Sequence, residues 1–200
     1  CPGTNYNPLF IYGGVGLGKT HLMHAVGNKM LQNNPNCKIL CVSAQNFMND
    51  FTTAVRENTY DQFNNKYHNV DALFIDDVQY LCGDKRQIQN KLFEAFEKLV
   101  PYGKQIIFTS DTYARSLKAM DERLISRFTS GLSVEVEPPE LETRAMILQK
   151  KAMANNFHLP DDVAFFIAKH LKSNVRELEG AFNRIIAKSR IMNTSEITLE

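Results

Sequence analysis

The stretch that decides the fold is Gly13-Gly14-Val15-Gly16-Leu17-Gly18-Lys19-Thr20. It matches the phosphate-loop pattern G-x-x-x-x-G-K-[ST], in which glycines let backbone N–H groups turn toward phosphates. The apolar run Leu9–Tyr12 precedes it and an amphipathic segment starting at His21 follows it, as a buried strand and a helix would. A glycine-rich turn before a helix is the alternative. The flanking strand and helix favour nucleotide binding.

The end of this stretch carries the groups that would meet the nucleotide. Lys19 should reach the β- and γ-phosphates of ATP or ADP, and the Thr20 hydroxyl should bind Mg²⁺. Both residues open the next helix, whose N-terminus adds partial positive charge. The predicted nucleotide contacts are Gly14, Gly16, Leu17, Gly18, Lys19, Thr20 and His21.

Composition bounds the class of protein. The 200 residues are 44% hydrophobic and 22% charged, which is typical of a soluble globular protein with one or two domains. The net charge of +1 predicts no general attraction to polyanions, so a nucleic-acid contact would depend on local placement. Four cysteines without C-x-x-C spacing predict reduced thiols in the cytoplasm. We expect no membrane segment or signal peptide, and a chain that is an excised piece of a longer protein.

Short apolar runs alternate with helical patterns over the first two thirds of the chain. This alternation predicts an α/β fold with a five-stranded parallel sheet covered on both faces. The predicted strands are Leu9–Tyr12, Lys38–Val42, Ala72–Ile75, Gln105–Phe108 and Leu132–Val136.

The helical patterns between these strands are specific enough to be tested. After the loop, one helical face should carry Leu22, Val26, Met30 and Leu31. Apolar spacings of three and four predict two consecutive helices in 44–67, although a simple crossover needs only one, and Ser43 should cap the first of them. Later helices are predicted over Lys85–Val100 and Leu117–Phe128.

Pro138-Pro139 breaks the alternation, and the composition turns helical beyond it. Three helices are predicted, over Leu141–Asn155, Asp161–Leu171 and Asn174–Ile191. We therefore expect an α/β nucleotide-binding domain in 1–137, with the two-helix insertion at 44–67, and a small helical lid in 138–200.

Two acids follow the third strand. Asp76 lies at its carboxyl end, where ligands bind in open α/β sheets, and should hold Mg²⁺ together with Thr20. Asp77 should polarise the attacking water. Two acids that cap a turn are the alternative, which the phosphate loop disfavours. Related ATPases commonly have Glu at the second position, so the shorter Asp77 predicts slow hydrolysis.

Polar and basic residues at three further places suit a nucleotide site. Thr109-Ser110-Asp111 ends the fourth strand, where turn chemistry is the alternative to a sensing role. Arg123 and Arg127 share a helical face near Asp121-Glu122, and they form either a solvated basic face or an arginine finger. Arg176 opposes the dipole at the start of the last helix, which indicates an anion partner or an ion pair with a nearby acid.

The successive motifs resemble those of the bacterial chromosomal replication initiators, a family of AAA+ ATPases. The likeness runs in order along the whole chain, through Asn7–Leu22, Phe74–Gln79, Thr109–Asp111, Arg123–Phe128, Glu137–Arg144 and Ser173–Gly180. It implies a P-loop AAA+ domain with a helical lid and ATP between them. It makes Asp111 the first sensor and Arg176 the second, with Arg127 a finger supplied in trans and Arg123 beside it.

The same resemblance implies DNA binding. In the family, the insertion and the residue at the Arg86 position grip single-stranded origin DNA within an ATP-dependent helical filament, and Thr52, Lys85 and Arg86 are the candidates here. Replicative helicase and regulatory proteins are further implied partners. The insertion contains only Arg56 and Lys66 as cations, and Asp84 stands where relatives have lysine, so we expect weak, salt-dependent binding.

Two other functions fit parts of the pattern. A nucleotide-dependent adaptor, such as a helicase loader or an initiator-inactivating relative, would bind partners and hydrolyse little. A nucleotide or small-molecule kinase would share the loop but not the arginines or the lid sequence. We expect an initiator that hydrolyses ATP weakly, because Arg127 and the two-helix insertion favour it.

Overall fold

A computed structural model describes residues 3, 5–155, 157–171 and 174–191. By their contacts these residues form two compact units. One consists of the chain up to Gly13 together with Lys19–Val136, and the other consists of Gly14–Gly18 together with the chain from Glu137 onward.

The first unit is built on a parallel sheet with the strand order β2-β3-β4-β1-β5. All four strand pairs are parallel, and Phe10 in the centre of β1 lies opposite Phe108 of β4 and Ser133 of β5. The predicted five-stranded parallel sheet is thus confirmed. The strands are β1 (Leu9–Tyr12), β2 (Ile39–Ser43), β3 (Ala72–Asp76), β4 (Gln105–Ser110) and β5 (Leu132–Glu135).

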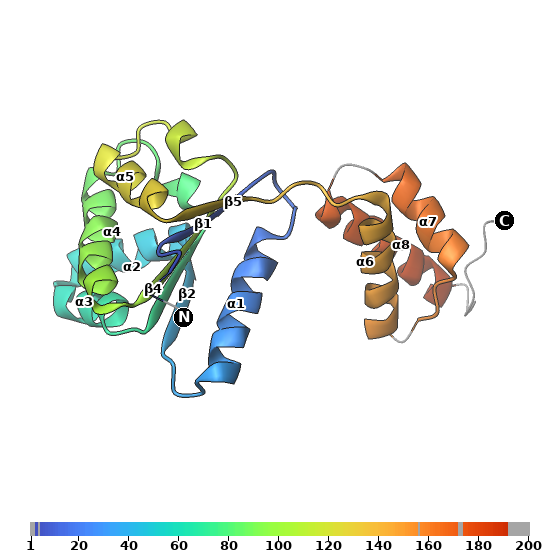
Figure 1. Ribbon diagram of the computed structural model, residues 1–200, viewed down its shortest axis with the longest axis horizontal. Helices are drawn as coiled ribbons and strands as arrows, with labels where there is room; N and C mark the ends of the chain where they lie inside the picture. Colours follow the sequence, from blue (N-terminus) through green and yellow to red (C-terminus); the bar gives the residue numbers. More distant parts are fainter. Residues whose placement is uncertain (1–2, 4, 156, 172–173, 192–200) are drawn as a thin grey trace. The chain divides into compact units, whose positions relative to one another are not determined.

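Helices cover both faces of this sheet, as the alternation in β3 requires. Leu73 and Ile75 pack into the larger core with α2, α3, α4 and α5, whereas Phe74 points to the opposite face and packs against α1. The ribbon shows α1 on one face of the sheet and the other helices of this unit on the opposite face (Figure 1). The helices of this unit are α1 (Lys19–Asn33), α2 (Ala44–Glu57), α3 (Tyr60–His68), α4 (Arg86–Leu99) and α5 (Glu122–Ser130), with short 3₁₀ turns η1 (Val78–Leu81), η2 (Val100–Tyr102) and η3 (Ala114–Ser116).

The buried face of α1 differs from the predicted one. The helix buries Lys19, Met23, Gly27 and Met30, whereas the side chains of Leu22 and Leu31 are exposed. Gly27 explains the difference, because a Cβ atom at this position would lie 3.0 Å from the Phe74 ring. The helix approaches the sheet most closely at Gly27, which has no side chain. A prediction from the positions of large apolar residues does not detect this face.

The two helices expected between 44 and 67 are confirmed as α2 and α3. The Ser43 side chain caps α2 by accepting a hydrogen bond from the Asn46 N–H at 3.1 Å. Their inner faces form an aromatic cluster of Phe47, Phe51, Phe63 and Tyr67, with ring centroids 4.7–5.6 Å apart. The Tyr67 hydroxyl donates to Asp50 at 2.6 Å, and burial raises the pKa of Tyr67. One side of this insertion is therefore part of the core.

The prediction of a helix over Leu117–Phe128 is wrong at its start. Ala119 adopts a left-handed backbone conformation with φ 55°, and Asp121 caps a helix that begins at Glu122. Leu117 and Met120 are nevertheless buried in the core. Leu117 and Met120 precede the helix in an irregular loop that also packs into the core. Their spacing from the apolar residues of the helix led to a predicted helix that starts too early.

The second unit contains three helices among its described residues: α6 (Leu141–Ala154), α7 (Asp161–His170) and α8 (Val175–Ile191). They pack around Leu148, Ala164 and Phe182, which are fully buried. The predicted helices are confirmed to within a residue at each described end, and Asn174 caps α8 by accepting from the Glu177 N–H at 2.8 Å. Among the helices described in either unit, none is long and apolar enough to cross a membrane.

Candidate nucleotide-binding site

The glycine loop has the backbone that its sequence requires. Gly16 and Gly18 have φ values of 77° and 92°, in the left-handed region that side chains other than glycine rarely adopt. Lys19 follows as the first residue of α1 and is 7% exposed, and its Nζ donates to the Gly13 carbonyl at 2.8 Å. The Gly13 N–H in turn donates to the carbonyl of Ser110 at 3.3 Å, so the start of the loop is tied to the end of β4.

A cluster of oxygen atoms lies at the carboxyl ends of β3 and β4. The Thr20 hydroxyl donates to Asp76 Oδ2 at 2.8 Å, and the Thr109 hydroxyl donates to Asp76 Oδ1. The structure thus brings Thr20 and Asp76 together, as the predicted Mg²⁺ pair requires. Thr109 belongs to the polar stretch that was expected at the end of the fourth strand, but its bond to Asp76 was not predicted. β4 runs two residues past its predicted end, and only the strand order shows that it lies beside β3.

Asp77 has an uncommon backbone conformation. Its φ of 58° and ψ of 54° are left-handed, which costs a non-glycine residue on the order of 1–3 kcal/mol and is frequent at functional sites. Its N–H donates to the Thr109 hydroxyl at 2.8 Å, and its carboxylate accepts from Gln79 Nε2 at 3.0 Å. The Oε1 atom of the same Gln79 side chain accepts from the Asp111 N–H at 3.3 Å. Gln79 therefore links Asp77 to Asp111, a connection that the sequence motifs did not indicate.

The ligand types at this cluster suit Mg²⁺. Thr20 and Asp76 supply a hydroxyl and a carboxylate, the hard oxygen donors that Mg²⁺ prefers together with phosphate oxygens and water. Among the residues that the structure describes, no group of three or more His, Cys, Asp or Glu side chains could hold a metal ion. The cysteines Cys37, Cys41 and Cys82 are free thiols.

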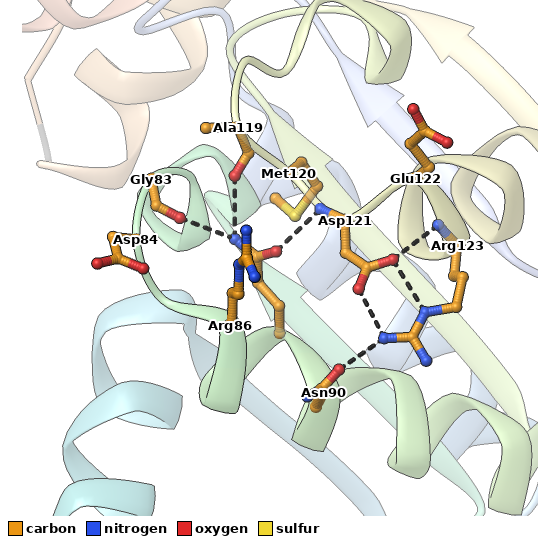
Figure 2. Close-up of a pocket in the computed structure, with 10 residues that line it drawn as sticks. Gly83, Asp84, Arg86, Asn90, Ala119, Met120, Asp121, Glu122 and Arg123 are labelled. Atoms are coloured by element: carbon orange, nitrogen blue, oxygen red, sulfur yellow. Dashed lines mark hydrogen bonds and ion pairs between the residues drawn. The ribbon is translucent and has the colours of Figure 1, made fainter.

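The two arginines of α5 are both held by α4. Arg123 donates to Asp121 from Nε at 3.0 Å and from a terminal nitrogen at 2.6 Å, and it also reaches Asn90 at 2.6 Å (Figure 2). The hydrogen bonds from Arg123 hold the pKa of Asp121 below its usual range. Arg127 pairs with Glu97 on α4 at 2.9 Å, and not with Asp121 or Glu122, which are nearer in sequence. The folding of α5 against α4 supplies this partner from a distant part of the sequence.

The remaining nucleotide candidates lie near the loop in the chain or in the second unit. His21 is exposed on the first turn of α1, and Leu17 is half-buried. Arg176 is exposed in the first turn of α8. It follows Val175, whose N–H donates to the Gly16 carbonyl at 3.1 Å within the second unit.

The DNA candidates share one hollow in the first unit. Thr52 from α2 and the pair Lys85 and Arg86 from the start of α4 line a depression of about 470 Å³. The cations of the insertion itself are already paired, Arg56 with Glu57 at 3.1 Å and Lys66 with Asp50 at 2.6 Å. The structure thus brings together the three candidates from two elements that are distant in sequence.

Known proteins resemble this chain throughout its length. A family model described as the bacterial DnaA ATPase domain matches residues 1–135. The chromosomal replication initiator protein DnaA of Herminiimonas arsenicoxydans is 55% identical over 199 residues, which cover 100% of this chain and 43% of that protein. The chain therefore spans less than half the length of this relative.

Solved structures agree with the sequence comparison. Domain III of the replication initiation protein DnaA from Thermotoga maritima has a TM-score of 0.93 and 41% identity, and the match covers 99% of this chain and 82% of that one. A replication initiator DnaA bound to AMPPCP and single-stranded DNA has a TM-score of 0.81 and 38% identity, over 92% of this chain and 56% of that one. With its glycine loop, its Thr20–Asp76 pair and its five-stranded parallel sheet, the chain belongs to the bacterial DnaA ATPase-domain family.

Proposed function

We propose that this chain is the ATP-binding, slowly hydrolysing switch domain of a bacterial replication initiator. With ATP bound, it assembles with further copies on single-stranded origin DNA in the cytoplasm, and hydrolysis returns it to the unassembled state. We assign residues 1–137 to the nucleotide-binding domain, 44–67 to its insertion and 138–200 to the helical lid. The observation that carries the proposal is the Thr20–Asp76–Thr109 cluster at the base of a glycine loop.

Nucleotide binding is assigned to the loop and the start of α1. The backbone N–H groups around Gly14, Gly16 and Gly18 face the phosphates, and the Lys19 ammonium exchanges the Gly13 carbonyl for β- and γ-phosphate oxygens. Leu17 and His21 contact the nucleotide at the edges of the loop.

Magnesium is assigned to Thr20 and Asp76. Their oxygen atoms are already 2.8 Å apart, so both can join one coordination shell with phosphate oxygens and water. When bound, Mg²⁺ neutralises charge that develops on the phosphates. Thr109 holds the other carboxylate oxygen of Asp76 and thereby orients it toward Thr20.

Hydrolysis is assigned to Asp77, which orients the attacking water. Its carboxylate is held by Gln79, and Gln79 also binds the backbone of Asp111, so Asp111 is suited to report the state of the γ-phosphate to Asp77. Arg127 of a neighbouring copy supplies positive charge to the transition state, with Arg123 beside it. Arg176 is the second phosphate sensor.

DNA binding is assigned to the hollow lined by Thr52, Lys85 and Arg86. Two cations beside a hydroxyl suit the phosphates of a flexible strand. A DnaA relative binds single-stranded DNA, which supports this assignment.

Assembly on a DNA strand tests the proposal. In the presence of a long oligo(dT), we expect ATP to produce large complexes in sedimentation velocity, whereas ADP leaves the chain monomeric. The physical reason is that only ATP offers a γ-phosphate for Arg127 of a second copy. ATP binding without any nucleotide-dependent assembly would favour an adaptor, and phosphorylation of an acceptor would favour a kinase.

Replacing Arg86 by alanine should weaken oligo(dT) binding and reduce its salt dependence. Each phosphate contact with a single strand contributes about 0.7 to the slope of log K against log salt concentration, so the slope should fall by about that amount. Fluorescence anisotropy with labelled oligo(dT) at several salt concentrations measures it. Arg56→Ala is the matched control, because Arg56 already pairs with Glu57 on the exposed face of α2. Equal slopes for wild type and Arg86→Ala would remove Arg86 from the DNA site.

A further inference from the structure

A buried amide lies beneath a surface hollow between α4 and α5. Gln89 on α4 is 3% exposed and its side chain forms hydrogen bonds at both ends. Its Nε2 donates to the carbonyls of Leu81, Gly83 and Ala119 at 2.8, 3.3 and 3.2 Å. Its Oε1 accepts from the Asp121 N–H at 2.9 Å. Glutamine is usually exposed on a helix, and a buried polar side chain is stable only when its polar atoms have hydrogen-bond partners, as those of Gln89 do.

These bonds join two loops that are distant in sequence. One loop, Cys82–Lys85, leads into α4 and carries Lys85 next to Arg86. The other, Leu117–Asp121, leads into α5. The Gly83 N–H also donates to the Ala119 carbonyl at 3.1 Å, so the loops touch directly beside Gln89. Ala119 holds a left-handed conformation, which persists only where the surroundings determine it.

The second loop sets the position of the arginines on α5. Asp121 is the N-cap of α5, and its carboxylate also accepts two hydrogen bonds from the Arg123 guanidinium. Figure 2 shows the bonds from Gly83, Ala119 and Asp121 converging on one side chain, with the Arg123–Asp121–Asn90 contacts beside it. Arg86 and Arg123 line the same hollow of about 670 Å³. The Gln89 amide therefore supports both the Cys82–Lys85 loop, which leads to Arg86, and the Leu117–Asp121 loop, which leads into α5.

We propose that Gln89 is a positioning residue that couples strand binding at Lys85 and Arg86 to the arginine face of α5. When Lys85 and Arg86 bind a DNA strand, the Cys82–Lys85 loop shifts. The shift moves the Gly83 carbonyl and, through Gln89, the Ala119 carbonyl. Because the Gln89 amide also accepts from the Asp121 N–H, Asp121 moves with it. Arg123 and the start of α5, which carries Arg127, then move as well. DNA thereby favours the α5 position that a neighbouring copy accepts. This inference rests on the proposed function and adds a route by which one of its activities regulates the other.

The chemistry of the amide makes the proposal testable by two substitutions. Gln89→Met keeps the length and volume of the side chain but provides neither a donor nor a strong acceptor. Gln89→Glu keeps the shape and the acceptor, but an ionised carboxylate cannot donate to the three carbonyls. Gln32→Met is the matched control, because Gln32 is exposed in the last turn of α1.

The experiment measures self-association of the chain in ATP with and without saturating (dT)₃, which is too short to serve as a template for two copies. For wild type and for Gln32→Met, we expect (dT)₃ to raise the self-association constant by roughly 5- to 10-fold, within the usual range of coupling between sites. For Gln89→Met, the ratio should fall below about 2-fold, while the ATP dissociation constant and the monomer's affinity for (dT)₃ stay near the wild-type values. A wild-type ratio in Gln89→Met overturns the proposal.

Gln89→Glu supplies a second readout that loss of packing would not change. Burial and the three carbonyls raise the pKa of the introduced carboxyl, as do Asp84, Asp121 and Glu122, whereas Arg86, Arg123 and Lys85 lower it. As the pH falls through the range in which the introduced carboxyl becomes protonated, the acid regains a donor, so the (dT)₃ effect should recover in Gln89→Glu relative to wild type and not in Gln89→Met. A flat ratio in Gln89→Glu across this range counts against the proposal.

The outcomes separate the inference from the function on which it rests. If wild type does not assemble with ATP on long oligo(dT), the proposed function fails and the coupling fails with it. If wild type assembles on long oligo(dT) but (dT)₃ leaves its self-association unchanged, only the coupling is overturned.

Discussion

Lys19→Ala is expected to weaken ATP binding by roughly 10- to 100-fold. Hydrogen bonds to charged groups contribute about 1.5–3 kcal/mol, and every 1.4 kcal/mol is tenfold in affinity. Lys19 is buried at the start of α1, where its ammonium lies 2.8 Å from the first carbonyl of the loop. The next two residues of the helix, Thr20 and His21, do not carry the permanent positive charge that would be needed to replace the ammonium of Lys19. Isothermal titration with ATP and with ADP measures the change.

Lys29→Ala is the control for this experiment. Lys29 is an exposed lysine on the same helix, so its removal changes the net charge equally without touching the loop. We expect its affinity for ATP to stay within a factor of about two of wild type, as for exposed surface changes. Circular dichroism on Lys19→Ala checks that the fold survives the loss of the bond to Gly13. Equal ATP binding by a folded Lys19→Ala and wild type would overturn the nucleotide assignment.

Arg127→Ala is expected to abolish the acceleration of ATP hydrolysis that assembly produces, an effect on the order of 10³-fold for an arginine supplied in trans. The Arg127 side chain is 42% exposed and pairs with Glu97, so a phosphate of another copy can replace one carboxylate as its partner. ATP affinity of the isolated chain should not change, because we assign Arg127 to the site of a neighbouring copy. Release of phosphate from assembled and unassembled protein measures the difference.

Mixing the Arg127→Ala and Lys19→Ala variants makes this prediction sharper. Arg127→Ala retains an intact loop, and Lys19→Ala retains Arg127, so a mixture should recover part of the accelerated hydrolysis that neither variant shows alone. Arg115→Ala, which removes an exposed arginine from η3, is the control and should behave as wild type. Loss of ATP binding by Arg127→Ala alone would show that this arginine acts within its own chain.

The sequence determined much of the framework, because its signals are local. The glycine loop predicts its own left-handed residues, apolar runs predict the strands, and Ser43 and Asn174 predict caps through bonds to residues three positions away. Asp76 was predicted at the end of β3 by four preceding apolar residues, and the structure places it within hydrogen-bond distance of Thr20.

Only the tertiary structure decided what depends on contacts across the sequence. The order of the strands brings Thr109 of β4 to Asp76, and the packing of α5 on α4 gives Arg127 its partner Glu97. Gly27 faces the sheet, where a Cβ atom would lie 3.0 Å from the Phe74 ring. In the sequence, Gln89 is one of several polar residues on α4 and nothing distinguishes it. In the structure it is buried between two loops and forms hydrogen bonds to both. Spacing along the chain records neither the neighbour of a strand nor the partner of a buried amide, because both are set by residues far away in sequence.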